Sequence, residues 1–182
     1  MRLLLLAIII LSAQFAHGQK TGYKTYKNAA HQISFRIPTD WEVRYSKAQG
    51  GLIGVPVTKA GKELYTECFE GIAFRIYFYP ANLAQTLMDE GYSKVGNRYY
   101  TTDRMSDSVA AEQISGKGWT GIYHNNVCGI SCRETGFHAG AGSCEFLYCS
   151  DGKRTVCITT NGRQFDDAVL QEIIRSLSFN AK

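Results

Sequence analysis

Alternation of apolar and polar residues along the chain predicts a series of β-strands. Residues 31–38 alternate strictly between the two kinds of side chain, which is typical of a half-buried strand. The turn residues Pro38-Thr39-Asp40 separate this segment from a second alternating one at 41–45. β-Branched and aromatic residues between turn signals predict further strands at 52–58, 72–79, 99–102, 110–115, 119–124, 145–149 and 154–160.

Two segments have the period of an amphipathic helix instead. Asn82 and Gln85 resemble a capping box after a proline, and Gly91 is a natural stop. Asp166 is a candidate cap for a helix near the C-terminus. The apolar stripes of the two helices are Leu83, Leu87 and Met88, and Leu170, Ile173, Ile174 and Leu177. Strands joined by short turns, together with a few helices, predict one α+β domain with a mainly antiparallel sheet.

The first eighteen residues have the anatomy of a secretory signal peptide. Arg2 supplies a positive start, residues 3–11 are apolar without a break, and Ala16 and Gly18 suit a cleavage site. This apolar stretch is shorter than the roughly 20 residues that cross a bilayer. We expect a soluble, exported protein, periplasmic or secreted, with no membrane span in its mature chain. The expected organisation is a signal peptide at 1–18, a polar lead-in at 19–30 and a single globular domain at 31–182.

Composition and charge exclude some classes of protein. Of the 182 residues, 45% are hydrophobic and 20% are charged, which is typical of a globular chain and not of a disordered one. The formal net charge is +4 without any run of lysines or arginines. Because nucleic-acid binding requires a basic stripe, we expect no nucleic-acid partner.

The six cysteines all follow the leader. An even number in an exported chain predicts a disulfide framework. A zinc site is the alternative, with His124, His138 and four of the cysteines as ligands, but their spacing matches zinc motifs only loosely. Because export leads to an oxidising compartment, we favour disulfides and expect no metal. The candidate disulfide residues are Cys68, Cys128, Cys132, Cys144, Cys149 and Cys157.

Spacing restricts the disulfide pairing. A hairpin turning at Asp151-Gly152 places Cys149 and Cys157 on opposite faces of its two strands, so these two should not bond. If residues 127–134 form a strand, Cys128 and Cys132 lie about 13 Å apart, beyond the reach of a disulfide. We therefore expect first a bridge from Cys132 to Cys144, closing the glycine-rich loop between them.

A family resemblance appears at the two ends of the chain. Residues 33–43 read apolar–x–apolar–Pro–x–x–Trp–x–Val, which resembles the opening of PsbP-like domains. Segments 155–160 and 173–179 are similar to the last strand and closing helix of that superfamily. The resemblance implies an α/β/α sandwich around a mainly antiparallel sheet, here braced by disulfides. It also implies kinship with exported bacterial proteins of unassigned role, and no particular reaction.

The sequence contains little that points to catalysis. Residues 116–121 match the dinucleotide-binding pattern G-x-G-x-x-G, but a strand follows them where that site needs a helix, so they predict a hairpin turn. No nucleophile elbow, P-loop or H-E-x-x-H motif occurs. We expect no catalytic residue and no cofactor.

Aromatic and charged residues around the cysteine-rich segment are candidates for an interaction surface. Two aromatics near the glycine turn could form a recognition patch, although such residues more often belong to the core. The histidines could instead act as general bases or as partners of a free thiolate. The residues proposed for the surface are Trp119, Tyr123, His124, Arg133 and His138.

Three hypotheses about function follow. The first is an exported, non-enzymatic binding protein, such as an inhibitor or an immunity-type protein, whose partner is another extracytoplasmic protein. A disulfide-braced surface is pre-organised for such binding. The second is a cysteine-dependent redox protein or hydrolase. The third is a carrier of a small ligand, with a cavity between sheet and helix.

Overall fold

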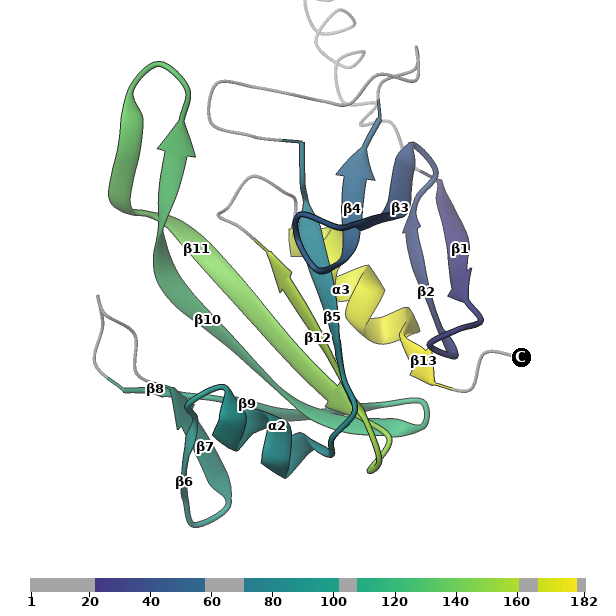
Figure 1. Cartoon of the computed structure of the whole chain (residues 1–182), viewed down its shortest axis with the longest axis vertical. Coiled ribbons are helices and arrows are strands. Elements are labelled where there is room, and N and C mark those ends of the chain that lie inside the picture. The colour runs from purple at the N-terminus through teal and green to yellow at the C-terminus, as the bar shows by residue number, and fades with distance from the viewer. Residues whose placement is uncertain (1–21, 58–70, 102–107, 161–166, 180–182) are drawn as a thin grey trace, which may run out of the picture.

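The computed structural model of the chain describes residues 22–57, 71–101, 108–160 and 167–179. These residues form thirteen strands in three sheets and two helices, and every pair of named strands is antiparallel (Figure 1). The prediction of an α+β fold with an α/β/α sandwich is therefore wrong. The protein is mainly β, because each face of the central sheet is covered by a small sheet together with a single helix.

The central sheet has seven strands in the order β3-β4-β5-β12-β11-β10-β9. The order shows that β5 lies beside β12, although residues 80–154 separate the two strands in the chain. The bounds are Trp41–Ser46 for β3, Gly51–Pro56 for β4, Phe74–Tyr79 for β5, Glu112–Gly116 for β9, Trp119–Cys132 for β10, Gly136–Ser150 for β11 and Thr155–Thr160 for β12.

One face of this sheet, the α3 face, is closed by apolar packing. It is covered by helix α3 (Asp167–Ser176) and by a three-stranded sheet in the order β1-β2-β13. The covering strands are β1 (Tyr23–Asn28), β2 (Ile33–Pro38) and β13 (Ser178–Phe179). Alternation along β2 directs Ile33, Phe35 and Ile37 into the core, where none is more than 1% exposed.

The opposite face, the α2 face, is covered by what we call the α2 layer. The layer consists of helix α2 and a three-stranded sheet in the order β6-β7-β8. Its elements are α2 (Leu83–Asp89), β6 (Ser93–Val95), β7 (Arg98–Thr101) and β8 (Val109–Ala110). The layer packs Leu87, Tyr92 and Tyr99 against Ile122 and Tyr148 of the sheet.

The segments predicted as strands are confirmed as β2, β3, β4, β5, β7, β9 and β12, and those at 119–124 and 145–149 as parts of the longer strands β10 and β11. The turn at 116–118 is confirmed as the connection between β9 and β10. The polar lead-in expected over 19–30 instead contains β1, which pairs with β2 along its whole length. Residues 23–28 lack the apolar pattern of a strand because β1 is an edge strand, and edge strands bury little apolar surface.

Both predicted helices are confirmed, with differences at their ends. Asn82 caps α2, because its Oδ1 accepts the backbone N–H of Gln85 at 3.0 Å. The capping box is incomplete, since the Gln85 side chain donates to Asp89 instead. Gly91 adopts φ of +84° after the helix, a conformation that favours glycine. In α3, Leu170 and Ile173 are buried as predicted, whereas the proposed cap Asp166 lies outside the described residues.

The signal peptide predicted at 1–18 also lies outside the described residues. In the described part of the chain, no helix is long and apolar enough to cross a membrane.

Candidate functional site

A two-stranded arm extends from the central sheet. Strand β9 pairs only with residues 119–123 of β10, and β12 only with residues 146–150 of β11. Residues 124–132 and 136–145 therefore continue as a hairpin that has no further strand beside it among the residues described. We call this hairpin the arm, and Figure 1 shows its distal end at the upper left. A register shift between Cys128 and Ile130 marks an irregularity halfway along it.

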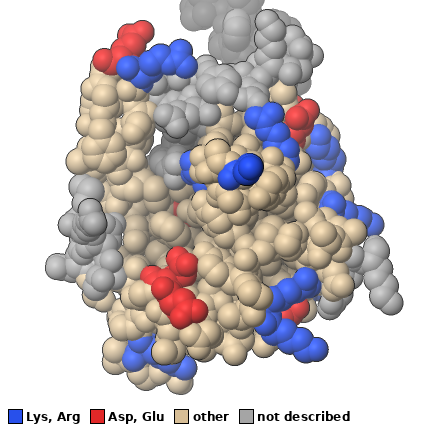
Figure 2. All heavy atoms as spheres, viewed as in Figure 1, with Lys and Arg blue, Asp and Glu red and all other residues tan. Residues whose placement is uncertain are grey.

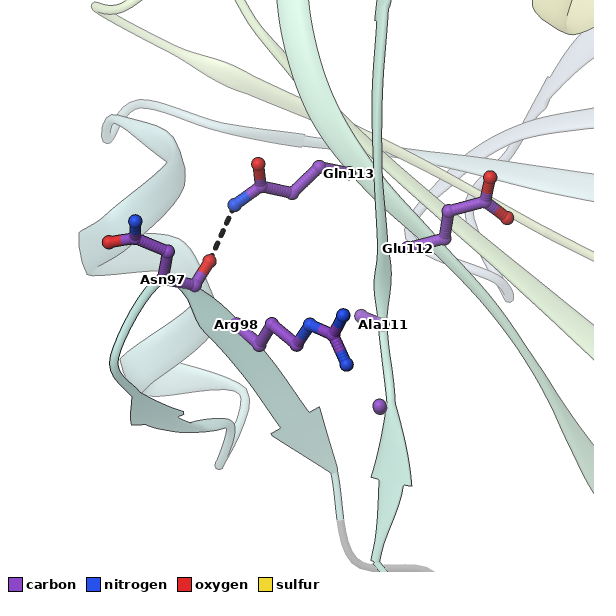
Figure 3. A pocket seen from close by; sticks show the side chains of 6 residues that line it. Asn97, Arg98, Ala111, Glu112 and Gln113 are labelled. Atoms are coloured by element: carbon purple, nitrogen blue, oxygen red, sulfur yellow. Dashed lines mark hydrogen bonds between the residues drawn. The ribbon is translucent and has the colours of Figure 1, made fainter.

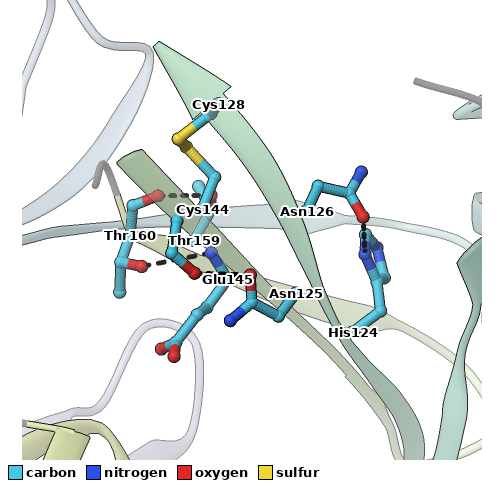
Figure 4. The surroundings of a disulfide bond; sticks show 9 residues. His124, Asn125, Asn126, Cys128, Cys144, Glu145, Thr159 and Thr160 are labelled. Carbon is cyan, nitrogen blue, oxygen red and sulfur yellow. Dashed lines mark hydrogen bonds between the residues drawn. A yellow bond between two sulfur atoms is a disulfide. The ribbon is translucent and has the colours of Figure 1, made fainter. Parts of the chain in front are cut away.

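The Cys128–Cys144 disulfide joins the two strands of the arm, with 5.7 Å between the Cα atoms (Figure 4). Cys144 lies opposite Asn126, two residues from Cys128, so the cysteines are diagonal neighbours on one face. The predicted bridge from Cys132 to Cys144 is therefore wrong, because the residues between them form the arm itself and not a loop to be closed. Cys132 belongs to a different disulfide, and Cys68 lies outside the described residues.

The distal end of the arm exposes an aromatic ring. The side chain of Phe137 is 67% exposed and lies over Gly129 of the facing strand, where a Cβ atom would meet the ring. Arg133 and Glu134 form the turn beyond it, and Figure 2 shows a basic and an acidic group together at this end. His138 is exposed and its Nε2 lies 2.8 Å from the Thr135 hydroxyl oxygen. An exposed aromatic ring on a braced hairpin is suited to binding another protein.

The five residues predicted for an interaction surface do not form one surface. Trp119 is only 4% exposed, and its indole N–H donates to the carbonyl of Leu177 at 2.9 Å. Tyr123 is partly buried against the core of the α3 face, and His124 is 4% exposed on the α2 face. Only Arg133 and His138 are exposed, and both lie at the distal end of the arm.

His124 belongs to a buried set of polar side chains at the base of the arm. Its Nδ1 lies 2.9 Å from Oδ1 of Asn126, and its Nε2 contacts the hydroxyl of Tyr92. Because an amide oxygen only accepts hydrogen bonds, Nδ1 carries the proton and Nε2 accepts from Tyr92. The imidazole also stacks on Phe146, with ring centroids 4.9 Å apart and planes 11° from parallel. Burial lowers the pKa of His124, although its bond to Asn126 partly offsets that effect.

The set continues from Tyr92 towards the middle of the sheet. The hydroxyl of Tyr148 is within hydrogen-bond reach of Tyr92 and of the Cys157 thiol. Burial raises the pKa of both tyrosines. We call Tyr92, His124, Asn126, Tyr148 and Cys157 the polar cluster. It was not foreseen as a unit, because its members come from β10, β11, β12 and the turn after α2.

Two cysteines that were expected in disulfides, Cys149 and Cys157, are free and buried. Cys149 lies opposite Val156 and packs into the core of the α3 face, whereas Cys157 lies opposite Tyr148 on the α2 face. The prediction that they face opposite sides and do not bond is thus confirmed, although the hairpin register differs by two residues. Burial raises the pKa of Cys157 to about 12 and that of Cys149 well above its usual value, so neither is a thiolate at neutral pH.

Two open pockets flank Gln113 at the edge of the central sheet. One, of about 460 Å³, is lined by Asn97, Arg98 and residues 110–113, and Figure 3 shows Gln113 reaching the Asn97 carbonyl. The other, of about 410 Å³, lies between the α2 layer and the sheet. Its apolar lining comes from Leu83, Tyr99 and Ile122, and Ser115 and Thr120 add hydroxyl groups.

The zinc alternative is not supported by the geometry. Two of its six proposed ligands, Cys128 and Cys144, are bonded to each other. Within the described ranges, no three His, Cys, Asp or Glu side chains lie close enough together to hold a metal ion.

Comparison with known proteins adds little about function. No family model matches the chain, and no curated protein matches it, so the PsbP-like resemblance stays a prediction. A crystal structure from Bacteroides thetaiotaomicron VPI-5482 is similar, with a TM-score of 0.49 and 14% sequence identity. The alignment covers 86% of this chain and 48% of that one, so the chain spans about half of the length of that structure.

Two features of the site escaped the sequence. Phe137 is the one aromatic residue in the glycine- and alanine-rich segment 136–144, and that isolation was a usable signal of an exposed ring. Tyr92 directly follows the helix stop at Gly91, but nothing local to it indicates a bond to His124, which is 32 residues away.

Proposed function

We propose that the protein is exported and acts as a non-enzymatic binding protein whose partner is another extracytoplasmic protein. The exposed ring of Phe137 on a disulfide-pinned arm is the observation that carries this proposal. A hairpin held by a disulfide loses little conformational entropy when a partner binds it, and aromatic residues supply much of the binding energy in protein interfaces.

The state of the cysteines supports export. Disulfides form and persist in oxidising compartments such as the periplasm and the extracellular space. A bridge within the arm is in keeping with that environment, as is the leader expected at 1–18.

The two free thiols argue against the alternative of a cysteine-dependent enzyme. A nucleophilic cysteine needs both solvent access and a lowered pKa, whereas Cys149 and Cys157 are no more than 2% exposed and have raised pKa values. Tyr148, which is within hydrogen-bond reach of the Cys157 thiol, is itself buried and neutral.

The small-ligand carrier is a second candidate. The observation that favours it is the open pocket of about 410 Å³ between Leu83 of α2, Tyr99 of β7 and the edge of the central sheet. Its mixed apolar and hydroxyl lining suits a small amphipathic molecule. The pocket is open to solvent on one side, which favours weak binding.

A matched pair of exposed aromatic residues tests the binding proposal. Phe137→Ala removes the ring at the distal end of the arm, and Tyr45→Ala removes an equally exposed ring (69%) on β3. Each purified protein is immobilised with its native disulfides and exposed to envelope and secreted fractions. We expect a partner that the unmodified protein and Tyr45→Ala both retain and that Phe137→Ala binds at least tenfold more weakly. If the two variants retain the same proteins equally well, the arm is not the binding element.

A further inference from the structure

We propose that the contact between Tyr92 and His124 is an acid-released latch, which holds the α2 layer on the central sheet and loosens when His124 takes up a proton. Tyr92 belongs to the connection between α2 and β6, and His124 belongs to β10 of the sheet. The bond between them therefore joins the two layers directly.

The hydrogen-bond directions explain why a proton disturbs the latch. In the neutral ring Nε2 accepts from the Tyr92 hydroxyl, because Nδ1 already donates to Asn126. A proton from solvent converts Nε2 into a donor, so the Tyr92 hydroxyl must turn its own hydrogen away from the ring and towards Tyr148, the other hydroxyl within its reach. Protonation therefore forces the hydrogen bonds of the buried cluster to rearrange and places a charge on a ring that is only 4% exposed.

The surroundings offer little compensation for a buried imidazolium. The groups in contact with His124 are Asn126 on its own strand, Phe146 on β11 and Tyr92 after α2. Tyr148 and Cys157 follow behind Tyr92 in the same cluster. All of them are neutral at pH 7. The carboxylate of Glu90, at the end of α2, interacts with Tyr92, Tyr148 and Cys157 of this cluster, but it is exposed and accepts a bond from Tyr79. Its attraction is therefore weakened by solvent.

The sign of the effect follows from proton linkage. A histidine whose pKa is lower in the folded state than in the open state binds fewer protons when the latch is closed. The latch therefore contributes fully above the ordinary histidine pKa of 6.5 and weakens as the pH falls below it. Down to the folded-state pKa, the equilibrium constant for opening the layer rises by up to a factor of about ten for each pH unit.

Release of the latch would also change the pocket beside it. The pocket of about 410 Å³ takes Leu83 and Tyr99 from the α2 layer, and Thr120 and Ile122 from the sheet. When the layer separates from the sheet, these two walls move apart and the apolar surface of Ile122 becomes accessible. The device therefore couples external acidity to access at this site.

Amide hydrogen exchange measures the latch without perturbing it. The amides of Glu90 and Tyr92, which bond to carbonyls within α2, report on the layer, and the amide of Leu177 reports on the α3 face. After correction for intrinsic exchange, we expect opening at Glu90 and Tyr92 to increase by up to about fivefold between pH 6.5 and 5.5, and opening at Leu177 to change much less. If opening at the two faces changes in parallel, or not at all, the latch proposal fails.

Two further measurements make the test specific. His124→Phe keeps a ring against Phe146 but cannot be protonated, so the pH dependence at Glu90 and Tyr92 should disappear. His31→Phe is the matched control: this partly buried histidine stacks on Phe78 on the α3 face, and its loss should leave the α2 response intact. Direct NMR titration of His124 in the unmodified protein requires no variant to fold, and a pKa at or above 6.5 would overturn the proposal.

Discussion

The two faces of the central sheet are closed by different chemistry. On the α3 face, aliphatic and aromatic side chains from β2, α3 and β13 interdigitate with those of the sheet. On the α2 face, the smaller core contains Tyr92, Tyr148 and Cys157, and the buried His124 joins them through Tyr92. Apolar burial is non-directional and does not depend on pH, whereas a buried hydrogen-bonded cluster depends on geometry and on protonation.

One sheet therefore carries an apolar core on one face and a polar, titratable cluster on the other. The arm continues from the same two strands that hold His124 and Tyr148, and its disulfide lies beside Asn126 at the end of the polar cluster. The buried hydrogen bonds and the disulfide therefore lie together at the base of the arm, where the proposed binding element begins. The α3 face supplies most of the apolar packing.

The largest loss in the free energy of unfolding is expected when a side chain in the core of the α3 face is truncated. Phe35→Ala removes a ring that is fully buried and in contact with Phe74 and Tyr26. We expect the free energy of unfolding in urea to fall by about 3–5 kcal/mol, because the lost burial adds to the cost of the cavity. Phe137→Ala, which removes the same ring from an exposed site, should change it by less than about 0.5 kcal/mol. Similar losses in the two variants would refute the assignment of the α3 face as the principal core.

The second-largest loss in the free energy of unfolding is expected when the disulfide of the arm is removed. Replacing both Cys128 and Cys144 with serine releases a constraint between residues 16 positions apart. For a loop of this size we expect a loss of about 3 kcal/mol, measured by chemical unfolding of both proteins under non-reducing conditions. Hydrogen exchange should increase in the arm and in α2 but not in α3. An increase spread evenly over both faces would show that the bridge stabilises the whole domain and not the α2 face.

These differences also explain what the sequence predicted and what it did not. Strands such as β2 and β3 were predictable because one side of each is buried and their side chains alternate. Strand β1 and the distal arm were missed because edge strands bury little and carry no alternation. The sequence predicted that Cys149 and Cys157 lie on opposite faces, because alternation along paired strands settles this even when the register is shifted by two residues. The partner of Cys144 could be predicted only with the exact register of the arm.

The α/β/α prediction failed for a related reason. The family resemblance rested on the two ends of the chain, where two successive strands, a last long strand and a helix are present as β2, β3, β12 and α3. Among the described residues, the opposite side of the sheet carries one helix only, because α2 has seven residues and shares that face with β6–β8. A short helix and several short polar strands gave no pattern that distinguishes a covering sheet from loops.

A smaller effect is expected from removing one hydroxyl on each face. Tyr92→Phe leaves Nε2 of the buried His124 without a donor, so we expect a loss of about 1–3 kcal/mol in the free energy of unfolding. Tyr26→Phe on the α3 face removes a hydroxyl that accepts from Asn28 at 3.2 Å in a partly buried position. That loss should stay below about 1 kcal/mol. Equal losses measured by urea unfolding would mean that the polar cluster contributes no more than an ordinary peripheral bond.

The smallest effect is expected where charge contributes to the α3 face. Arg36 on β2 and Glu172 on α3 form an ion pair at 2.7 Å, but the arginine side chain is 50% exposed. Because solvent screens such a pair, Glu172→Gln should lower the free energy of unfolding by about 0.2–1 kcal/mol, and by less at 0.5 M salt. The hydrogen bond from the backbone N–H of Arg36 to the Ser176 hydroxyl, at 2.8 Å, persists in the variant and keeps α3 in position. A loss well above 1 kcal/mol that disappears in salt would mean that charge, and not apolar packing, attaches α3 to the sheet.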